Sequence, residues 1–109
     1  MGTYVVTGGA SGIGAAIRQQ LESEGHRVLV VDIKQADISA DLGSSEGRSA
    51  AVQAIREAAG NDLTGLVACA GVGSHVPDRE LICNVNYFGA VDLVEGLRDV
   101  LAQRRASVL

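Results

Sequence analysis

Residues 7–14 read Thr-Gly-Gly-Ala-Ser-Gly-Ile-Gly, between an apolar run at 4–6 and an amphipathic run that starts at Ile13. This order predicts a strand, a tight turn and the start of a helix. The glycines at 8, 12 and 14 let the backbone adopt positive φ, approach a bulky anion and pack closely on the strand. The helix then directs free N–H groups and the positive end of its dipole at that anion, as at a nucleotide phosphate.

The spacing of these glycines, G-x-x-x-G-x-G, is not the common G-x-G-x-x-G fingerprint. It is not a Walker loop either, because no Lys-Ser/Thr pair follows. A glycine cluster alone is weak evidence for a nucleotide site, since an ordinary tight turn has the same composition. The choice between a nucleotide site and an ordinary turn therefore depends on the residues that follow.

A second predicted strand, Arg27 to Val31, is closed by Asp32, which follows Gly14 by 18 positions. Dinucleotide folds place a ribose-binding acid about 20 residues after the glycine turn. A carboxylate there accepts hydrogen bonds from both ribose hydroxyls and repels a 2′-phosphate, which predicts NAD rather than NADP. No basic residue stands at Ser11 or Ile33 to attract a 2′-phosphate, although Lys34 is near. The alternative is that Asp32 is a solvated residue at the end of a strand.

Strand and helix patterns alternate along the rest of the chain. The first helix has Ile13, Ile17 and Leu21 on its inner face and ends at Gly25. Alternation of this kind predicts a Rossmann-type doubly wound parallel sheet of four to five strands, with helices on both faces. We expect a short strand near 36–40, a helix from Ser44 or Ser45 to about Ala59 and a strand at 65–70. A long helix should follow from Leu81 or Ile82 to about Arg104, and a further strand should open at 106–109. The residues of the long helix expected to face inward are Val85, Phe88, Leu93, Leu97 and Val100.

Three motifs, in this order, resemble those of the short-chain dehydrogenases/reductases. Thr7-Gly8-x-x-x-Gly12-x-Gly14 with Asp32 looks like the cofactor motif of that family. Ala68-Cys69-Ala70-Gly71 resembles its Asn-Asn-Ala-Gly motif with both asparagines replaced, and Asn84-Val85-Asn86-Tyr87-Phe88-Gly89 resembles its Asn-Val-Asn-Leu-x-Gly motif. The match spans essentially the whole chain. Within the family, the last two variants most resemble the bacterial branch of hydroxysteroid dehydrogenases and carbonyl reductases.

The resemblance implies an NAD-dependent oxidoreductase that transfers a hydride between nicotinamide and a secondary alcohol or ketone, such as a hydroxysteroid or another carbonyl compound. It implies that Asp41 and the apolar residue after it contact the adenine ring, although Asp41 can also be a turn residue before Gly43. It assigns Asn86 a catalytic role, in which the backbone carbonyl positions a water of the proton relay; otherwise Asn86 only caps or kinks its helix. The implied cofactor-binding residues are Thr7, Gly8, Ser11, Gly12, Ile13, Gly14, Asp32, Ile33, Asp41, Leu42, Ala70 and Gly71.

Family members also carry a catalytic serine and a Tyr-x-x-x-Lys motif farther along the chain. Here the tyrosines are Tyr4 and Tyr87, the lysine is Lys34, and neither tyrosine has a lysine four positions on. We therefore expect residues 1–109 to be an NAD-binding Rossmann domain that is incomplete at its C-terminus, lacks the catalytic half and is inactive alone. The main alternative is a non-catalytic NAD-binding sensor or interaction module. A sugar-nucleotide epimerase fits less well, because its motif has a glycine where Ser11 stands.

Composition restricts the other function classes. The 109 residues carry a net charge of −4 with scattered charges, which argues against a nucleic-acid surface. No apolar run approaches the ~20 residues that span a membrane, and the first strand starts close to Met1, so we expect no signal peptide and a cytoplasmic protein. Cys69 and Cys83 indicate neither a disulfide framework nor a metal site. The resemblance implies a homo-oligomer when the protein is complete, although the short stretch at 72–81 puts the usual subunit contact in question.

Overall fold

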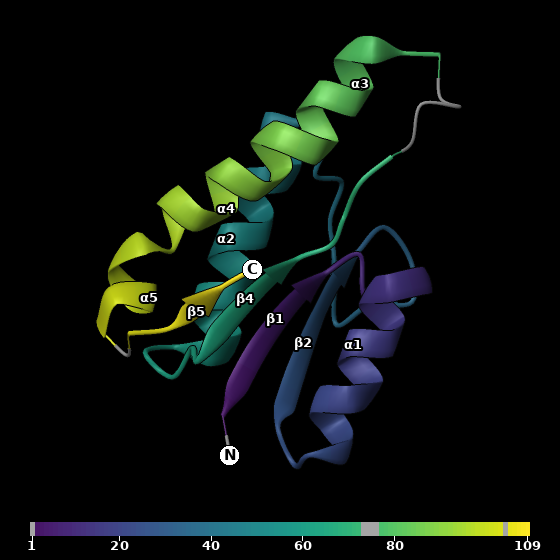
Figure 1. Cartoon of the computed structure of the whole chain (residues 1–109). Helices are drawn as coiled ribbons and strands as arrows, with labels where there is room; N and C mark the ends of the chain where they lie inside the picture. Colours follow the sequence, from purple (N-terminus) through teal and green to yellow (C-terminus); the bar gives the residue numbers. More distant parts are fainter. Residues whose placement is uncertain (1, 73–76, 104) are drawn as a thin grey trace.

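The computed structural model describes residues 2–72, 77–103 and 105–109, in which five parallel strands form one sheet. The strand order is β3-β2-β1-β4-β5, so the chain runs from β1 to one edge and then returns past β1 to the other (Figure 1). The carboxyl ends of the central strands therefore meet at one edge, where open parallel sheets bind ligands. The strands are β1 (Thr3–Thr7), β2 (Arg27–Asp32), β3 (Ile38–Ser39), β4 (Gly65–Ala68) and β5 (Ser107–Val108).

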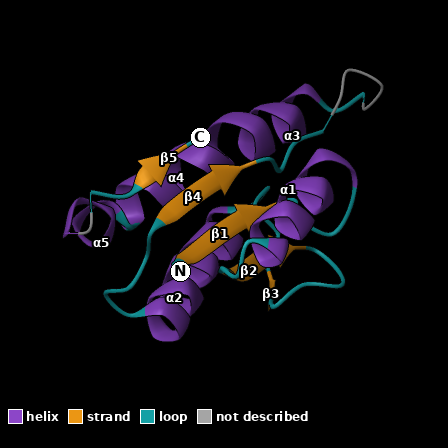
Figure 2. Ribbon diagram, turned by 60° about the horizontal axis from the view of Figure 1, so that its bottom comes forward, coloured by secondary structure: helices purple, strands orange, loops and turns teal. Residues whose placement is uncertain are grey.

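Helices cover both faces of the sheet, as the sequence predicts. Helix α1 (Gly12–Ser23) lies on one face, and α2 (Ser45–Ala59) lies on the other beside α4 (Gly89–Gly96) (Figure 2). Neighbouring residues of β1 show the two-sided burial: Val5 belongs to the core beneath α2 and α4, and Val6 to the core beneath α1. A strand that is buried on both faces needs a continuous apolar run, and such a run marked β1 and β2 in the sequence.

The ends of α1 and α2 carry the stop and start residues that the sequence indicates. Gly25 follows α1 with φ +88, and Gly60 ends α2 with φ +58, both in the region that favours glycine. The Ser44 side chain caps α2 by accepting a hydrogen bond from the Gly47 N–H at 3.0 Å. Both crossover helices therefore begin and end within a residue or two of the expected positions.

The prediction of one unbroken helix from 81 or 82 to about Arg104 is wrong. The structure divides it into α3 (Arg79–Cys83), a π-helical turn η1 (Asn84–Phe88), α4 and α5 (Arg98–Gln103), with a break at Leu97. Arg104 itself lies outside the described residues. The strands expected at 36–40 and 65–70 are also shorter, because pairing is limited to Ile38–Ser39 and Gly65–Ala68.

The inward position predicted for Phe88 is also wrong, because its side chain is exposed. The buried stripe passes instead through Gly89, Leu93 and Leu97. Gly89, Leu93 and Leu97 are four residues apart, so they share one face of an α-helix, and Phe88 lies about 100° around the helix from Gly89.

Helix α2 is joined to the break between α4 and α5 by one arginine. Arg56 donates a hydrogen bond to the Gly96 carbonyl oxygen at 2.7 Å and forms an ion pair with Asp99. The hydrogen bond from Arg56 holds the pKa of the Asp99 carboxyl below its usual value. None of the described helices is both long enough and apolar enough to cross a membrane.

Candidate functional site

A groove of about 350 Å³ lies at the carboxyl ends of β1, β2 and β4. It contains all of the predicted cofactor-binding residues except Thr7, together with five residues that the sequence did not single out. No lysine, arginine or histidine is among the lining residues that the structure describes, so the donors available to an anion there are backbone N–H groups and the Ser11 hydroxyl. The lining residues are Gly8, Ser11, Gly12, Ile13, Gly14, Val31, Asp32, Ile33, Ala40, Asp41, Leu42, Cys69, Ala70, Gly71, Val72 and Val85.

Three glycines of the turn have different structural roles. A Cβ on Gly14 would overlap the Gly8 carbonyl oxygen, so Gly14 is required for α1 to pack on the turn. A Cβ on Gly8 would come within 2.8 Å of the Ala70 backbone, so Gly8 is required where the turn passes the end of β4. Gly12, at φ +59, would direct a Cβ at no atom of the chain within 4 Å. Its missing side chain leaves space in the groove rather than in the core.

Asp32 lines the groove and is held by two backbone groups. One carboxylate oxygen accepts a hydrogen bond from the Ala10 N–H at 3.1 Å, and the other accepts one from the Ile33 N–H at 2.7 Å. The carboxylate is thus fixed between the glycine turn and the end of β2. Each oxygen has a further lone pair, and these can accept two hydroxyl groups.

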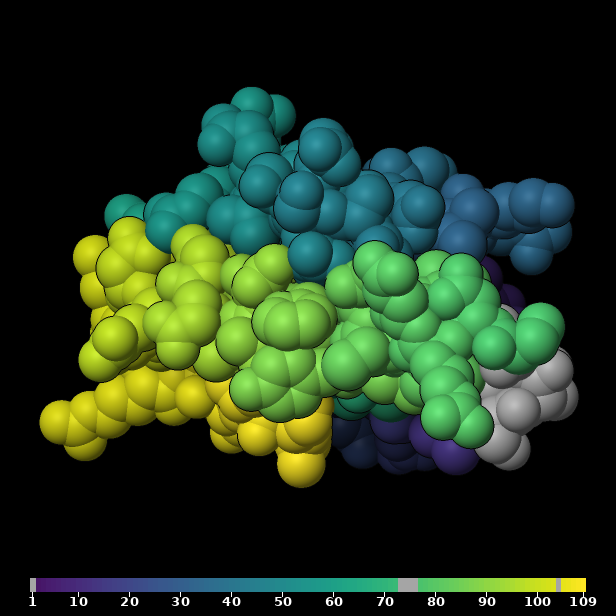
Figure 3. All heavy atoms as spheres, turned by 90° about the horizontal axis from the view of Figure 1, so that it is seen from above, coloured from purple at the N-terminus to yellow at the C-terminus, as the bar shows by residue number. Residues whose placement is uncertain are grey.

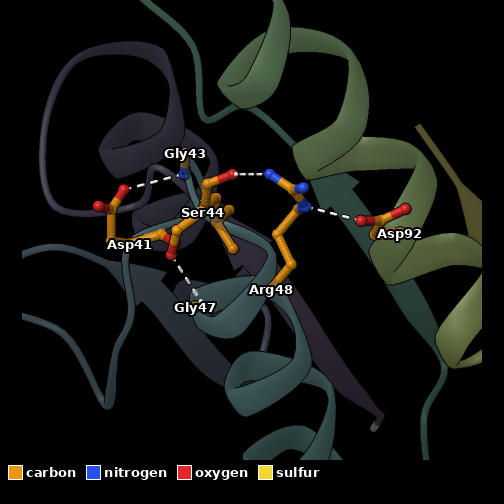
Figure 4. Close-up of polar contacts among 7 residues, drawn as sticks. Asp41, Gly43, Ser44, Gly47, Arg48 and Asp92 are labelled. Atoms are coloured by element: carbon orange, nitrogen blue, oxygen red, sulfur yellow. Dashed lines mark hydrogen bonds and ion pairs between the residues drawn. The ribbon is translucent and has the colours of Figure 1, made fainter. Parts of the chain in front are cut away.

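Asp41 and Leu42 form the part of the wall that precedes α2. Asp41 Oδ1 accepts a hydrogen bond from the Gly43 N–H at 2.9 Å, which is the turn role that the sequence left open (Figure 4). The side chain nevertheless lines the groove, so the turn role and a ligand role are compatible. A Cβ on Gly47 would overlap the Asp41 carbonyl oxygen, and α2 therefore starts directly against this segment.

Thr7 lies behind the groove, not in its lining. Its side chain is buried, and its Oγ1 accepts a hydrogen bond from the Ala70 N–H at 3.1 Å. This bond joins the carboxyl ends of β1 and β4 across 63 positions of sequence. The structure thus places Thr7 as a support for Ala70 and Gly71, which do line the groove.

Asn86 lies on η1 and forms a two-point clamp on the backbone of Val72. Its Oδ1 accepts a hydrogen bond from the Val72 N–H at 2.7 Å, and its Nδ2 donates one to the Val72 carbonyl oxygen at 3.0 Å. A Cβ on Gly71 would lie 3.1 Å from Asn86 Oδ1, so a glycine leaves room for the clamp. The Asn86 side chain therefore fixes the groove wall beside β4. Its place in a π turn fits this role, because π turns often occur at functional sites.

Five lining residues were missed by sequence reasoning: Val31, Ala40, Cys69, Val72 and Val85. All five directly precede or follow a predicted site residue, so their place in the sequence was a usable signal. Val85 directly precedes Asn86 and enters the groove from η1. The inner-face position predicted for Ile13 is wrong, because Ile13 is 77% exposed at the start of α1. With Ile33, which is 64% exposed, it leaves two large apolar side chains at the groove for a ligand to cover.

The chain is similar to several known oxidoreductases. It is 39% identical over 101 residues to the 3-alpha-hydroxysteroid dehydrogenase/carbonyl reductase of Comamonas testosteroni, a match that covers 93% of this chain and 39% of the relative. It is 37% identical over 99 residues to the coniferyl-alcohol dehydrogenase of Pseudomonas sp. strain HR199, covering 85% of this chain and 37% of the relative. The chain therefore spans about two fifths of the length of these curated relatives.

Solved structures give the same result. The 3-alpha-hydroxysteroid dehydrogenase from Pseudomonas sp. B-0831, crystallised with NADH, superposes with a TM-score of 0.94 at 43% identity, over 97% of this chain and 42% of that one. An oxidoreductase from Brucella ovis superposes with a TM-score of 0.86 at 28% identity, over 99% of this chain and 59% of that one. The short-chain dehydrogenase family profile matches residues 3–109. Since the profile, the fold and the glycine turn agree, this chain belongs to the short-chain dehydrogenase family.

Proposed function

We propose that this chain is the cofactor-binding part of an NAD-dependent oxidoreductase, which transfers a hydride between nicotinamide and a secondary alcohol or ketone such as a hydroxysteroid. Residues 1–109 form its dinucleotide-binding domain, and the complete enzyme is a homo-oligomer. The hydroxysteroid dehydrogenase/carbonyl reductase relatives, with the groove at the strand ends, support this assignment. Solved members of the family include complexes with NADH and with NADP, so the choice of cofactor has to be argued from this chain.

The observation that carries the choice of NAD is the position of Asp32. Its carboxylate lines the groove at the end of β2 and is held in place by the N–H groups of Ala10 and Ile33. A fixed carboxylate accepts hydrogen bonds from the two adenosine ribose hydroxyls and repels a 2′-phosphate. Among the described residues, the lining contains no basic side chain that would compensate for this repulsion.

The residues of the groove suit a dinucleotide along its whole length. The open space at Gly12 and the start of α1 suit a pyrophosphate, because backbone N–H groups point there and no Cβ intrudes. The exposed faces of Ile13 and Ile33 offer apolar cover for the ring systems. We assign the adenine end to Asp41 and Leu42, and the nicotinamide end to Ala70 and Gly71.

When bound, the nicotinamide ring supplies or accepts the hydride. Asn86 holds Val72 beside that end of the groove through both groups of its side-chain amide. We assign the backbone carbonyl of Asn86 the role of positioning a water in the proton relay. A proton donor to the substrate oxygen is needed as well, and Tyr4 and Tyr87 do not line the groove. We therefore assign the general acid to residues other than 1–109, and expect this chain alone to bind cofactor without turning over substrate.

Calorimetric titration with NAD and NADP tests the assignment. We expect the chain to favour NAD by about tenfold, or about 1.4 kcal/mol. Asp32→Asn removes the repelling charge and should bring the two affinities close together. Asp37→Asn is the matched control, since Asp37 follows in the loop after β2, accepts a hydrogen bond from the Val30 N–H at 2.8 Å and does not line the groove. Equal affinity of the unmodified chain for both cofactors would contradict the assignment.

A further inference from the structure

Arg48 is the one charged residue that the described part of the chain buries, with 8% of its surface exposed. It lies in the first turn of α2 and extends its guanidinium between three separate elements. Its Nε donates a hydrogen bond to Asp92 Oδ2 on α4 at 2.6 Å, and its NH1 donates one to the Leu42 carbonyl oxygen at 3.1 Å (Figure 4). Its guanidinium carbon also lies 5.8 Å from the ring centre of Phe88 on η1.

These contacts join the two sides of the groove from behind. Leu42 belongs to the wall that precedes α2, and Asp92 and Phe88 belong to the helical segment that carries Asn86. Helices α2 and α4 lie side by side in the space-filling view, where the teal and green surfaces meet (Figure 3). A buried guanidinium requires hydrogen-bonded partners, so the positions of the three elements are set together.

We infer that Arg48 is a positioning residue for the adenine end of the groove, because it fixes the Leu42 peptide relative to α4. This inference rests on the proposed function. By holding the Leu42 carbonyl, Arg48 sets the orientation of the Asp41–Leu42 segment that would recognise the adenine edge. A planar fork of several donors can serve the Leu42 carbonyl and Asp92 at once, whereas a lysine ammonium is a compact charge on a flexible stem.

Arg56 provides a matched control on the same helix. It also joins a backbone carbonyl, that of Gly96, to a carboxylate, that of Asp99, and so links α2 to the break between α4 and α5. Neither Arg56 nor its two partners line the groove. Arg48→Lys and Arg56→Lys therefore remove the same kind of bridge, but only Arg48 is bonded to a residue that lines the proposed site, Leu42.

The test compares NAD with its hypoxanthine analogue, in which an oxygen replaces the exocyclic amino group of adenine. Calorimetry on the 109-residue chain should show that the unmodified protein prefers NAD. Arg48→Lys should weaken NAD binding by about tenfold, the effect of one hydrogen bond from a charged donor, and bring the two affinities close together. Arg56→Lys should leave both the NAD affinity and the preference unchanged. A residue that only stabilises the fold would alter both ligands equally and leave the preference intact.

A second variant covers the case in which Arg48→Lys does not fold, which its thermal unfolding would show. Asp92→Asn keeps Arg48 and the shape of its partner while weakening the pair, and should reduce the preference for NAD in the same direction. An unchanged preference in the folded Arg48 or Asp92 variant would overturn the inference, as would an equal loss in Arg56→Lys. Absence of NAD binding by the unmodified chain would instead overturn the proposed function, and this inference with it.

Discussion

The two walls of the groove are built in different ways. The wall of β1, α1 and β2 is made by local sequence: a glycine turn, the first turn of a helix and Asp32 held by the Ala10 and Ile33 N–H groups. The wall beside β4 is held by partners from elsewhere in the chain, namely Thr7 on Ala70 and Asn86 on Val72. The side-chain hydrogen bonds of the first wall therefore come from its own residues, whereas those of the second wall come from other elements.

The largest effect is expected at the first wall, from Gly12→Val. No atom of the described residues lies within 4 Å of the added Cβ, so the clash falls on the ligand, and NAD affinity should drop about a hundredfold, or about 2.7 kcal/mol. Gly25→Val, at the other end of α1, is the control, because Gly25 also has a positive φ and open space around its Cβ. Both variants should lose similar stability, measured by thermal unfolding. Equal NAD affinity in the two would mean that the groove does not bind a pyrophosphate at Gly12.

An intermediate effect is expected at the second wall, from Asn86→Ala. This variant removes both hydrogen bonds to Val72 and should weaken NAD binding by about tenfold, or about 1.4 kcal/mol, because the backbone beside β4 is no longer fixed. Calorimetry on Asn84→Ala, in the same π turn but without a role in the clamp, should give the affinity of the unmodified chain. If Asn86→Ala bound NAD as tightly as Asn84→Ala, the clamp would not be part of the cofactor site.

The smallest effect is expected far from both walls, at the pair of Arg56 and Asp99. The hydrogen bond from Arg56 lowers the pKa of Asp99 in the folded protein below its ordinary value of 3.8. The pair therefore stabilises the fold fully at pH values above 3.8. This stabilisation is lost as the pH falls through the lowered pKa of the folded state. Thermal unfolding should therefore give a slightly lower Tm for Asp99→Asn than for the unmodified chain at neutral pH, and no difference at strongly acidic pH. NAD affinity should stay unchanged throughout, since neither residue lines the groove. A Tm difference that persists at low pH would assign the effect of Asp99 to packing or helix capping.

The same contrast explains what could be predicted from the sequence. Glycine positions, the Ser44 cap and the apolar runs encode local structure, so the order of strands and crossover helices was predictable up to the broken last helix. The first wall followed from residues 7–14 and Asp32 because their relation is local. The clamp of Asn86 on Val72 and the bridge from Arg48 to Leu42 depend on where separate elements pack, and a charged residue in a helix normally indicates a solvated face. The exposed position of Phe88, by contrast, could have been predicted, because the four-residue spacing from Leu97 and Leu93 leads back to Gly89.

The unequal pairing of β1 also has a consequence for how the fold assembles. Residues of β1 pair with residues of β2 that lie 24 positions away, but with residues of β4 that lie 61 positions away. Closing the longer loop costs about 0.8 kcal/mol more conformational entropy. The first wall can therefore form while the second is still unpaired, and the second is expected to open first in local unfolding. Amide protons of Ala68 and Cys69, which bond to Leu109 and Thr7, should then exchange with solvent sooner than those of β2, and cofactor that touches both walls would slow this exchange.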